Sequence, residues 1–251
     1  MSIISKYPIN FLTMNILAND KWTFGITTSF LNISKNGDNE YHLDDNIKNI
    51  INSIYLQNIP QDKYEIIIIG ANSIGDDITI NNNIHIKYFD ESIKDKWITK
   101  KKNIIFETAK FENIMVMHDY FVLDTNWYTG FQQFETNWDV CMVKIRNKDG
   151  TRWRDWILWW CGTAPYRIEH NGILLESNRL LYDDNRFTNT DMYINGSVII
   201  GKREYLINNK FDENLCWGQG EDCEWSQRCR PTWIYKMNTN SILKMLKQQA
   251  Q

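Results

Sequence analysis

The segment around position 118 carries residue types that could bind a metal ion or a phosphate. An apolar run at 114–117 is followed by His118, Asp119 and Tyr120. A carboxylate at a strand end suits Mg²⁺ or Mn²⁺, and Mn²⁺ tolerates a neighbouring imidazole better. We therefore consider Asp119 as a metal ligand, with His118 as a second ligand or as a hydrogen-bond donor to a phosphate. The alternative is a strand with an ordinary polar end.

A second group of candidate residues is a pair of acids behind a glycine-rich turn. Glu221 and Asp222 follow the Trp-Gly-Gln-Gly sequence at 217–220 and begin a predicted helix. A carboxylate in a partly desolvated pocket has a raised pKa, so it can accept a proton from an attacking hydroxyl. We favour Asp222 as the base, with Glu221 its closest rival and Glu224 in a structural role. Acids also offset the dipole at helix N-termini, but this alternative does not explain the preceding turn.

The first half of the chain alternates between predicted strands and helices. The continuous apolar run at 64–70 is typical of a central parallel strand that is buried on both faces. Such an alternation predicts a doubly wound α/β fold, with a mixed but mostly parallel sheet and helices on both faces. The predicted strands are 24–30, 64–70, 84–90 and 113–119, and the predicted helices are 43–59 and 101–111.

Three of these strands end in small or polar residues. In open α/β sheets, ligands bind beyond the carboxyl ends of the strands. The ends at 27–29, 70–73 and 118–120 therefore predict a binding crevice. On the pattern alone, the same residues are also ordinary turn formers.

The second half has less regular patterning. A helix is expected at 126–134, a strand at 138–147, and a strand with a short helix at 193–206. Residues 236–251 are expected to form a C-terminal helix or tail. The sequence has no linker or repeat, so we predict one domain whose halves are 22–125 and 126–235.

Composition excludes several classes of protein. The net charge of −3 argues against a dedicated nucleic-acid-binding protein. No run reaches the length of about 18 apolar residues that can cross a membrane. The N-terminus lacks the apolar core of a secretory signal. The five cysteines have neither zinc-ligand nor CxxC spacing, which favours reduced thiols and a cytoplasmic location.

Taken in order, these segments resemble glycosyltransferases of the GT-A fold, family 2 type. That family has a basic-Asn pair, a small residue in the following helix, and a strand that ends in Asp-x-Asp. Lys102-Asn103 and Ala109 match the first two features, and His118 lies where the family has its first aspartate. The segments at 123–127, 195–206 and 211–228 resemble, in turn, the family's Leu-Asp-Pro-x-Trp continuation, its acceptor-framing segment and its general-base block.

The resemblance implies a GT-A-like domain that transfers a hexosyl group from a nucleotide-sugar, expected to be UDP-linked, to a hydroxyl acceptor. The acceptor is expected to be a glycan, and the reaction is expected to invert the anomeric centre. Mn²⁺ or Mg²⁺ would be the cofactor, held by Asp119 and His118. The implied substrate-binding residues are Thr27, Thr28, Ser29, Asn72, Ser73, Lys102, Asn103, His118, Tyr120 and, as a platform for the acceptor, Trp217.

The sequence departs from the family pattern in two places. His118-Asp119-Tyr120 keeps an acid only at the central position of Asp-x-Asp, and the acidic turn after the second strand is replaced by 70–73. Lys102 could take over part of the role of the cation, or it could be a solvated lysine at a helix N-terminus. The altered Asp-x-Asp favours an alternative function, a catalytically silent GT-A-like module that binds glycans or nucleotide-sugars, whereas the retained Gly-x-Gly-Glu-Asp at 218–222 favours activity. A nucleotidyltransferase is disfavoured because no glycine-rich phosphate loop follows the first strand.

Two further features have open interpretations. Trp153, Trp156, Trp159 and Trp160 recur at near-helical spacing, so they could stack on sugar rings or form a stripe of the core. His170 could complete a metal site from the C-terminal half.

Overall fold

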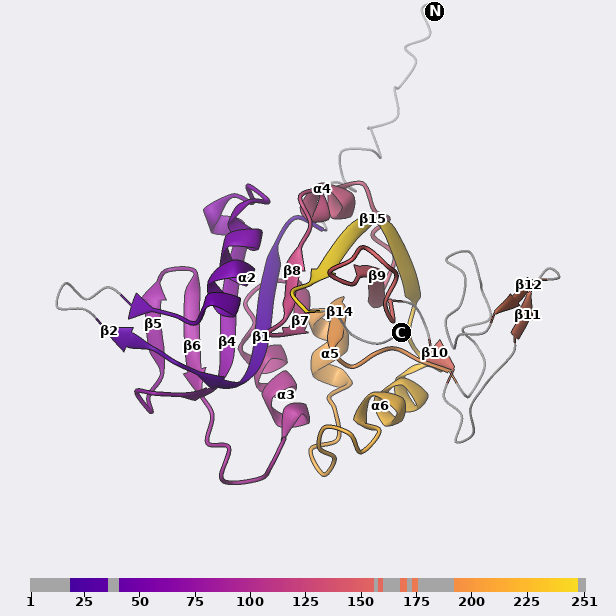
Figure 1. The fold of residues 1–251 in the computed structure, drawn as a ribbon. Coiled ribbons are helices and arrows are strands. Elements are labelled where there is room, and N and C mark those ends of the chain that lie inside the picture. The colour runs from indigo at the N-terminus through magenta and orange to yellow at the C-terminus, as the bar shows by residue number, and fades with distance from the viewer. Residues whose placement is uncertain are drawn as a thin grey trace, which may run out of the picture.

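The protein is described from a computed structural model, which covers residues 19–35, 41–155 and 192–247 and the short strands at 158–159, 168–170 and 173–175. Its centre is a nine-stranded mixed sheet with the order β5-β6-β4-β1-β7-β14-β9-β15-β8 (Figure 1). Within the described residues, no helix is long and apolar enough to cross a membrane.

Four parallel strands form the N-terminal part of this sheet. They are β6 (Ile84–Tyr88), β4 (Tyr64–Asn72), β1 (Trp22–Leu31) and β7 (Asn113–His118). Every residue of β4 from 64 to 70 is buried, as its continuous apolar run predicts for a strand that is covered on both faces.

Antiparallel pairing extends the sheet on both sides. The edge strand β5 (Ile78–Asn81) pairs with β6, and β14 (Val198–Lys202) pairs with both β7 and β9 (Val140–Arg146). Because β14 comes from the second half of the chain, strands of both halves belong to one sheet. The remaining described strands are β2 (Ser34–Lys35), β3 (Tyr41–His42), β8 (Phe121–Leu123), β10 (Leu158–Trp159), β11 (Ile168–His170), β12 (Ile173–Leu175), β13 (Met192–Tyr193) and β15 (Tyr235–Met245).

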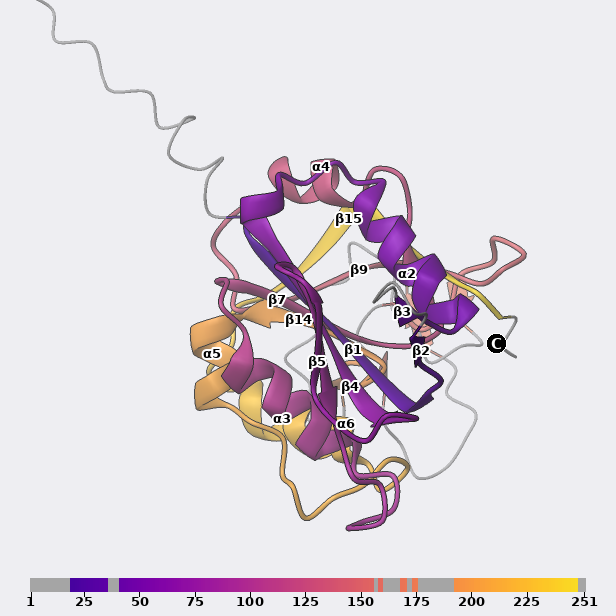
Figure 2. The same ribbon diagram turned by 90° about the vertical axis from the view of Figure 1, so that its left-hand side faces the viewer.

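Helices cover both faces of the sheet, which confirms the predicted fold class. Seen along the sheet edge, α2 (Asp45–Tyr55) lies on one side, whereas α3 (Ile98–Thr108) and α5 (Arg203–Asn208) lie on the other (Figure 2). Glycine allows α3 to approach β1, because a Cβ on Gly25 would lie 2.5 Å from Ile105 Cγ2. The other described helices are α4 (Trp127–Gln132), α6 (Glu221–Cys229) and the 3₁₀ turn η1 (Gln61–Lys63).

The C-terminal segment corrects one prediction. Residues 236–251 were expected to form a helix or tail, but Tyr235–Met245 is a strand, β15, which pairs parallel with β9 and antiparallel with β8. Ser241, Leu243 and Met245 are buried while Lys244 is exposed, which is the period of two that a strand requires. The local sequence also fits a helix, so pairing with distant strands decides its conformation.

The contact between α4 and β15 gives a test of this strand. A Cβ on Gly130, in α4, would lie 2.8 Å from the Asn240 backbone carbon and would also clash with Ser241 Oγ. In an unobstructed helix, alanine is more stabilising than glycine by about 0.5–1 kcal/mol. We expect Gly130→Ala instead to lower the free energy of unfolding by about 1–3 kcal/mol in urea denaturation, because the backbone of β15 must move.

The matched control is Thr129→Ala, at an exposed position in the same helix. Its effect should stay within about 0.5 kcal/mol. A Gly130→Ala protein that is more stable than the wild type would show that β15 does not pack against α4.

Candidate active site

A cavity of about 340 Å³ opens at the carboxyl ends of the parallel strands. It brings together six of the residues that were predicted to bind substrate, from segments far apart in the sequence. Four further lining residues were not predicted. The lining residues are Thr27, Thr28, Ser29, His118, Tyr120 and Trp217, together with Lys96, Ile98, Lys101 and Lys247.

The pairing of β1 with β7 explains why these strand ends meet. The two strands run parallel, and Thr27 lies opposite His118 in the register. The register between β1 and β4 shifts between Thr27 and Phe30, so Thr28 and Ser29 leave the regular ladder. Thr28 and Ser29 come directly after Thr27, the last residue of β1 that pairs with β7, and all three residues line the cavity.

His118 is buried beside Tyr120. Its Nδ1 lies 3.1 Å from the Tyr120 hydroxyl, and the two rings make an edge contact with centroids 5.5 Å apart. Burial lowers the pKa of His118, and the ammonium groups of Lys102, Lys247 and Lys101 add to the shift, so that this pKa is about 3. The imidazole is therefore neutral at neutral pH. Its Nε2 is buried without a hydrogen-bond partner among the described residues.

The side chain of Asp119 contacts Thr28, whereas the side chains of its neighbours His118 and Tyr120 contact each other. The Thr28 hydroxyl lies 2.7 Å from Asp119 Oδ2 and 3.0 Å from the Phe30 carbonyl oxygen. Asp119 does not line the cavity, whereas His118 and Tyr120 do. The one acid of this triplet thus fastens the end of β1.

These residues are a poor fit to a divalent metal. Mg²⁺ and Mn²⁺ favour several oxygen ligands, but the described lining of the cavity contains no Asp or Glu. Across the described ranges, no three His, Cys, Asp or Glu side chains are grouped so that they could hold a metal ion. The side chain of His170, the other candidate ligand, lies outside the described residues, as do those of Trp156, Trp159 and Trp160. Trp153 is buried in the core, with its ring centroid 5.8 Å from that of Phe121.

Three lysines contribute positive charge to the cavity. Lys101 donates a hydrogen bond to the Thr28 carbonyl oxygen at 2.8 Å and forms an ion pair with Glu91. Lys247 lies over the Tyr120 ring, with Nζ 3.8 Å from its centroid. The third is Lys96, whose Nζ lies 5.8 Å from the Trp217 ring centroid.

Lys102 is the most buried lysine near this site. Its side chain is 1% exposed, and Nζ has no hydrogen-bond partner within the described residues. The ammonium instead lies 4.6 Å from the Phe211 ring centroid. Burial lowers the pKa of Lys102, while the charges of Glu221 and Asp222 raise it. The predicted solvated lysine is therefore excluded, and the ammonium is coupled to the acidic pair.

The acidic pair is held at the start of α6. Gly218 and Gly220 have φ angles of 83° and 75°, in the left-handed region that favours glycine. Asp222 accepts hydrogen bonds from the Gly196 amide at 3.0 Å and from the Cys223 amide at 2.9 Å. A Cβ on Gly196 would lie 2.8 Å from Asp222 Cβ, so this approach requires glycine.

Glu221 lies in a more apolar environment than is usual for a carboxylate. It is buried, and this burial raises its pKa; the Lys102 ammonium opposes the shift and the Asp222 charge adds to it. Neither Glu221 nor Asp222 lines the 340 Å³ cavity. Lys102 connects the two groups electrostatically, because its charge acts on His118 and on both acids.

The backbone also connects the cavity to the acidic pair. The His118 amide donates to the Ser197 carbonyl oxygen at 3.1 Å, and the adjacent Gly196 amide donates to Asp222. The segment 196–197 is thus hydrogen-bonded to the end of β7 through Ser197 and to the start of α6 through Gly196. This arrangement can hold an anion in the cavity and a carboxylate base next to it.

The other predicted residues lie away from the cavity. Asn72 Oδ1 accepts hydrogen bonds from the Ile74 and Gly75 amides and so closes a turn. Ser73 Oγ donates to the Ile33 carbonyl oxygen at 2.6 Å and accepts from the Ile33 amide. Both side chains thus have structural contacts of their own, and their predicted contact with a nucleotide stays a prediction.

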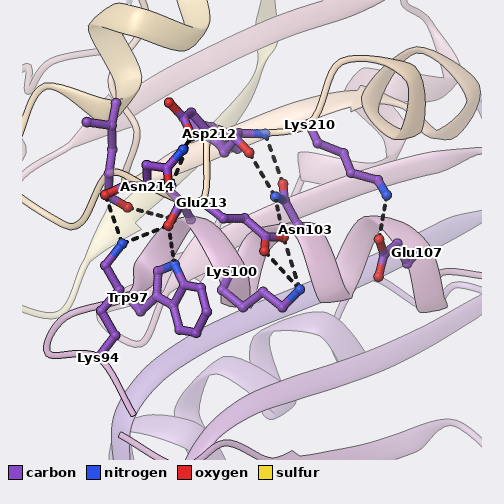
Figure 3. Close-up of polar contacts among 12 residues, drawn as sticks. Lys94, Trp97, Lys100, Asn103, Glu107, Lys210, Asp212, Glu213 and Asn214 are labelled. Carbon is purple, nitrogen blue, oxygen red and sulfur yellow. Dashed lines mark hydrogen bonds and ion pairs between the residues drawn. The ribbon is translucent and has the colours of Figure 1, made fainter. Parts of the chain in front are cut away.

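Asn103 fastens α3 to the segment that leads to the acidic pair. Its amide donates to the Phe211 carbonyl oxygen and its carbonyl oxygen accepts from the Phe211 amide, each at 2.9 Å. Figure 3 shows Glu213 next to Asn103, where its side chain also pairs with Lys100 and its backbone carbonyl oxygen accepts a hydrogen bond from the Trp97 indole. Asn103 therefore holds the segment that leads to the Trp217 turn and α6.

Comparison with known proteins gives no sequence relative. No family model and no curated protein sequence matches the chain.

Solved structures are similar in fold. TarS of S. aureus superposes with a TM-score of 0.55 at 12% identity, covering 90% of this chain and 36% of TarS. GalNAc-T7, in a complex with UDP, GalNAc and Mn²⁺, has a TM-score of 0.56 at 13% identity, with 92% of this chain and 45% of GalNAc-T7 covered. The mannosyltransferase PcManGT from Pyrobaculum calidifontis, with GDP-Man and Mn²⁺, gives 0.52 at 12% identity, with 90% and 56% covered.

The chain spans between 36% and 56% of the length of these proteins. At such low identity the likeness shows the fold alone. The chain therefore has the GT-A-like fold of these glycosyltransferases.

Proposed function

We propose that this chain transfers a hexosyl group from a UDP-linked sugar to a hydroxyl of a glycan, with inversion at the anomeric carbon. The observation that carries the proposal is the cavity at the carboxyl ends of the strands with an acidic pair beside it, of which Glu221 is buried and Asp222 half-buried. A complex of TarS with UDP-GlcNAc, which has a TM-score of 0.51 to this chain, supports the choice of donor class.

The proposed reaction is a single displacement. The acceptor oxygen attacks the anomeric carbon while the bond from that carbon to the diphosphate oxygen breaks, and the electron pair leaves with the diphosphate. The acceptor proton passes to the carboxylate of Asp222. This carboxylate has accepting capacity left, because two amide donors occupy only part of its lone pairs.

Apart from Trp217, the side chains that line the cavity are proposed to bind the donor. In this proposal the hydroxyls of Thr27 and Ser29 contact the nucleotide and the lysines contact the diphosphate; all of them line the cavity. The family resemblance implies Mn²⁺ or Mg²⁺ at Asp119 and His118, and two of the similar structures contain Mn²⁺. Because these two side chains do not fit a metal site, no step here uses one.

A silent module that binds nucleotide-sugars is the second candidate. The observation that favours it concerns the His118-Asp119-Tyr120 triplet. Its histidine and tyrosine line the cavity, whereas its acid, Asp119, does not. Such a module would bind the donor and release no nucleoside diphosphate.

Turnover separates the two candidates. Incubation with a panel of UDP- and GDP-sugars and glycan acceptors should release nucleoside diphosphate. Asp222→Asn keeps an oxygen that can accept the Gly196 hydrogen bond but removes the base, so we expect kcat to fall by a factor of about 10²–10⁴.

The control is Glu224→Gln in the same helix, where Glu224 pairs with Arg228. It should keep kcat within about threefold of the wild type. Donor binding without any turnover would support the silent module, and full activity of Asp222→Asn would exclude Asp222 as the base.

The pH dependence of stability tests the burial of Glu221. An unfolded chain ionises Glu221 near its ordinary pKa of 4.5, and the native pKa is higher. The stability that this group contributes is therefore complete below pH 4.5 and is lost as the pH rises through the native pKa. We therefore measure the free energy of unfolding by urea denaturation at several pH values. Relative to Glu221→Gln, this free energy in the wild type should fall by at most about 1.4 kcal/mol per pH unit between pH 4.5 and the native pKa.

A constant difference between the two proteins across pH 4.5–8 would contradict this account of Glu221. Glu224→Gln serves as the control again, because Glu224 forms a surface ion pair and should not produce the same trend.

Variants of Trp217 test whether its ring stacks on the acceptor. Its side chain is 57% exposed at the edge of the cavity, so it contributes little to the core. We expect Trp217→Ala to raise KM for the acceptor by about tenfold, with a smaller effect on KM for the donor, because a stacking surface is lost. Trp217→Phe keeps an aromatic face and should restore most of the affinity, whereas an equal loss in both variants would argue against stacking.

A further inference from the structure

We propose that the cavity binds the donor diphosphate through lysine side chains and without a divalent cation. This inference rests on the proposed function, since it concerns how the same cavity holds its nucleotide. Three of the described lining residues are lysines, Lys96, Lys101 and Lys247, and none is Asp or Glu. The cavity is therefore built to accept an anion directly.

The side chains of the His118-Asp119-Tyr120 triplet face in directions that do not suit a metal bridge. A metal bridge between protein and diphosphate needs carboxylates that face the diphosphate. His118 and Tyr120 line the cavity, but Asp119 does not and instead contacts the Thr28 hydroxyl. The two groups that face the cavity are an imidazole and a phenol in contact with each other at 3.1 Å. Because one of their two hydrogens is used in this mutual contact, the pair keeps one donor for a phosphate oxygen, and it does not provide a charged metal ligand.

The placement of the lysines is the second argument. Lys101 forms a hydrogen bond to the Thr28 carbonyl oxygen and an ion pair with Glu91, so its ammonium is held near the carboxyl end of β1. Lys247 reaches the cavity because the Leu246 amide, just after β15, donates to the Tyr120 carbonyl oxygen at 2.9 Å. Ammonium groups bind phosphate as compact point charges with three donors. They also repel a divalent cation from the space that they occupy.

Lys102 adds a buried charge to the same region. Its ammonium acts electrostatically on His118 and, in the described structure, lacks a hydrogen-bond acceptor. Charges interact more strongly in a poorly solvated interior than in water. As the bond to the sugar breaks, negative charge grows on the diphosphate leaving group, and fixed cations stabilise that change. Lys247, together with Lys101 and Lys102, whose charges Glu91 and the acidic pair partly offset, thus supplies positive charge that a metal would otherwise supply.

Isothermal titration with UDP and GDP, each in EDTA and in Mn²⁺, tests the proposal. We expect the Kd of the better nucleotide to agree within about threefold between the two buffers. Lys247→Gln should raise this Kd by about tenfold in EDTA, since it removes a cation from the cavity. Higher ionic strength should weaken binding in the wild type and do so less in the variant.

Lys244→Gln is the matched control. Lys244 is an exposed lysine of β15, three residues before Lys247, and it pairs with Asp124 at 2.9 Å outside the cavity. This variant carries the same change in net charge and should leave Kd unchanged within about twofold. An equal effect of both variants would mean that the net charge of the protein, and not the cavity, attracts the nucleotide, which overturns the proposal.

The remaining outcomes separate this inference from the proposed function. Nucleotide binding that weakens by about tenfold or more in EDTA would overturn the lysine site and leave the transferase proposal standing. The absence of UDP and GDP binding in both buffers would overturn the proposed function, and the inference would fail with it.

Discussion

The structure of the site depends on the hydrogen bonds at the carboxyl end of β7. This strand pairs parallel with β1 on one side and antiparallel with β14 on the other. The first pairing places Thr27 opposite His118, and the bond from the His118 amide to Ser197 fixes the turn that carries Gly196. Gly196 in turn holds Asp222. One strand end therefore sets the distance between the cavity and the acid that is proposed to act on its contents.

Helix α3 supplies the second constraint, through three consecutive residues with different directions. Successive residues of a helix are rotated by about 100°. Lys101 therefore reaches the end of β1, while Lys102 lies against Phe211 and near the acids, and Asn103 bonds to the Phe211 backbone. The helix thus joins the cavity, the acidic pair and the loop before α6 in one rigid unit. A change in its packing would alter the three contacts together.

The sequence predicts those parts of the structure whose signal is local. The apolar runs at 64–70 and 114–117 identify central strands, and the polar residues near the carboxyl ends of β1 and β7 identify the edge where the cavity opens. Lys247 was missed because its place depends on β15, whose conformation is decided by pairing with β9 and β8. Lys96 carries no such signal either, because it lies in a loop before α3. Asn103 matches a family motif, yet the motif does not say that its amide is bonded to a backbone 108 residues away.

Two buried groups at the site are unfavourable in the free protein. Lys102 Nζ and His118 Nε2 lack hydrogen-bond partners in the part of the chain that the structure describes. An unsatisfied buried polar group costs about 1–3 kcal/mol, and a charged one costs more. Sequences that fold well retain such groups mainly at functional sites, where a ligand provides the missing partner. His118 lines the cavity, so an anion bound there could accept a hydrogen bond from its imidazole, and the charge of Lys102 acts on the same region. Binding of an anion would therefore stabilise the fold, by an amount that grows with the logarithm of the ratio of its concentration to its Kd. The imidazole at the cavity and the buried charge near it thus favour a phosphate-bearing ligand.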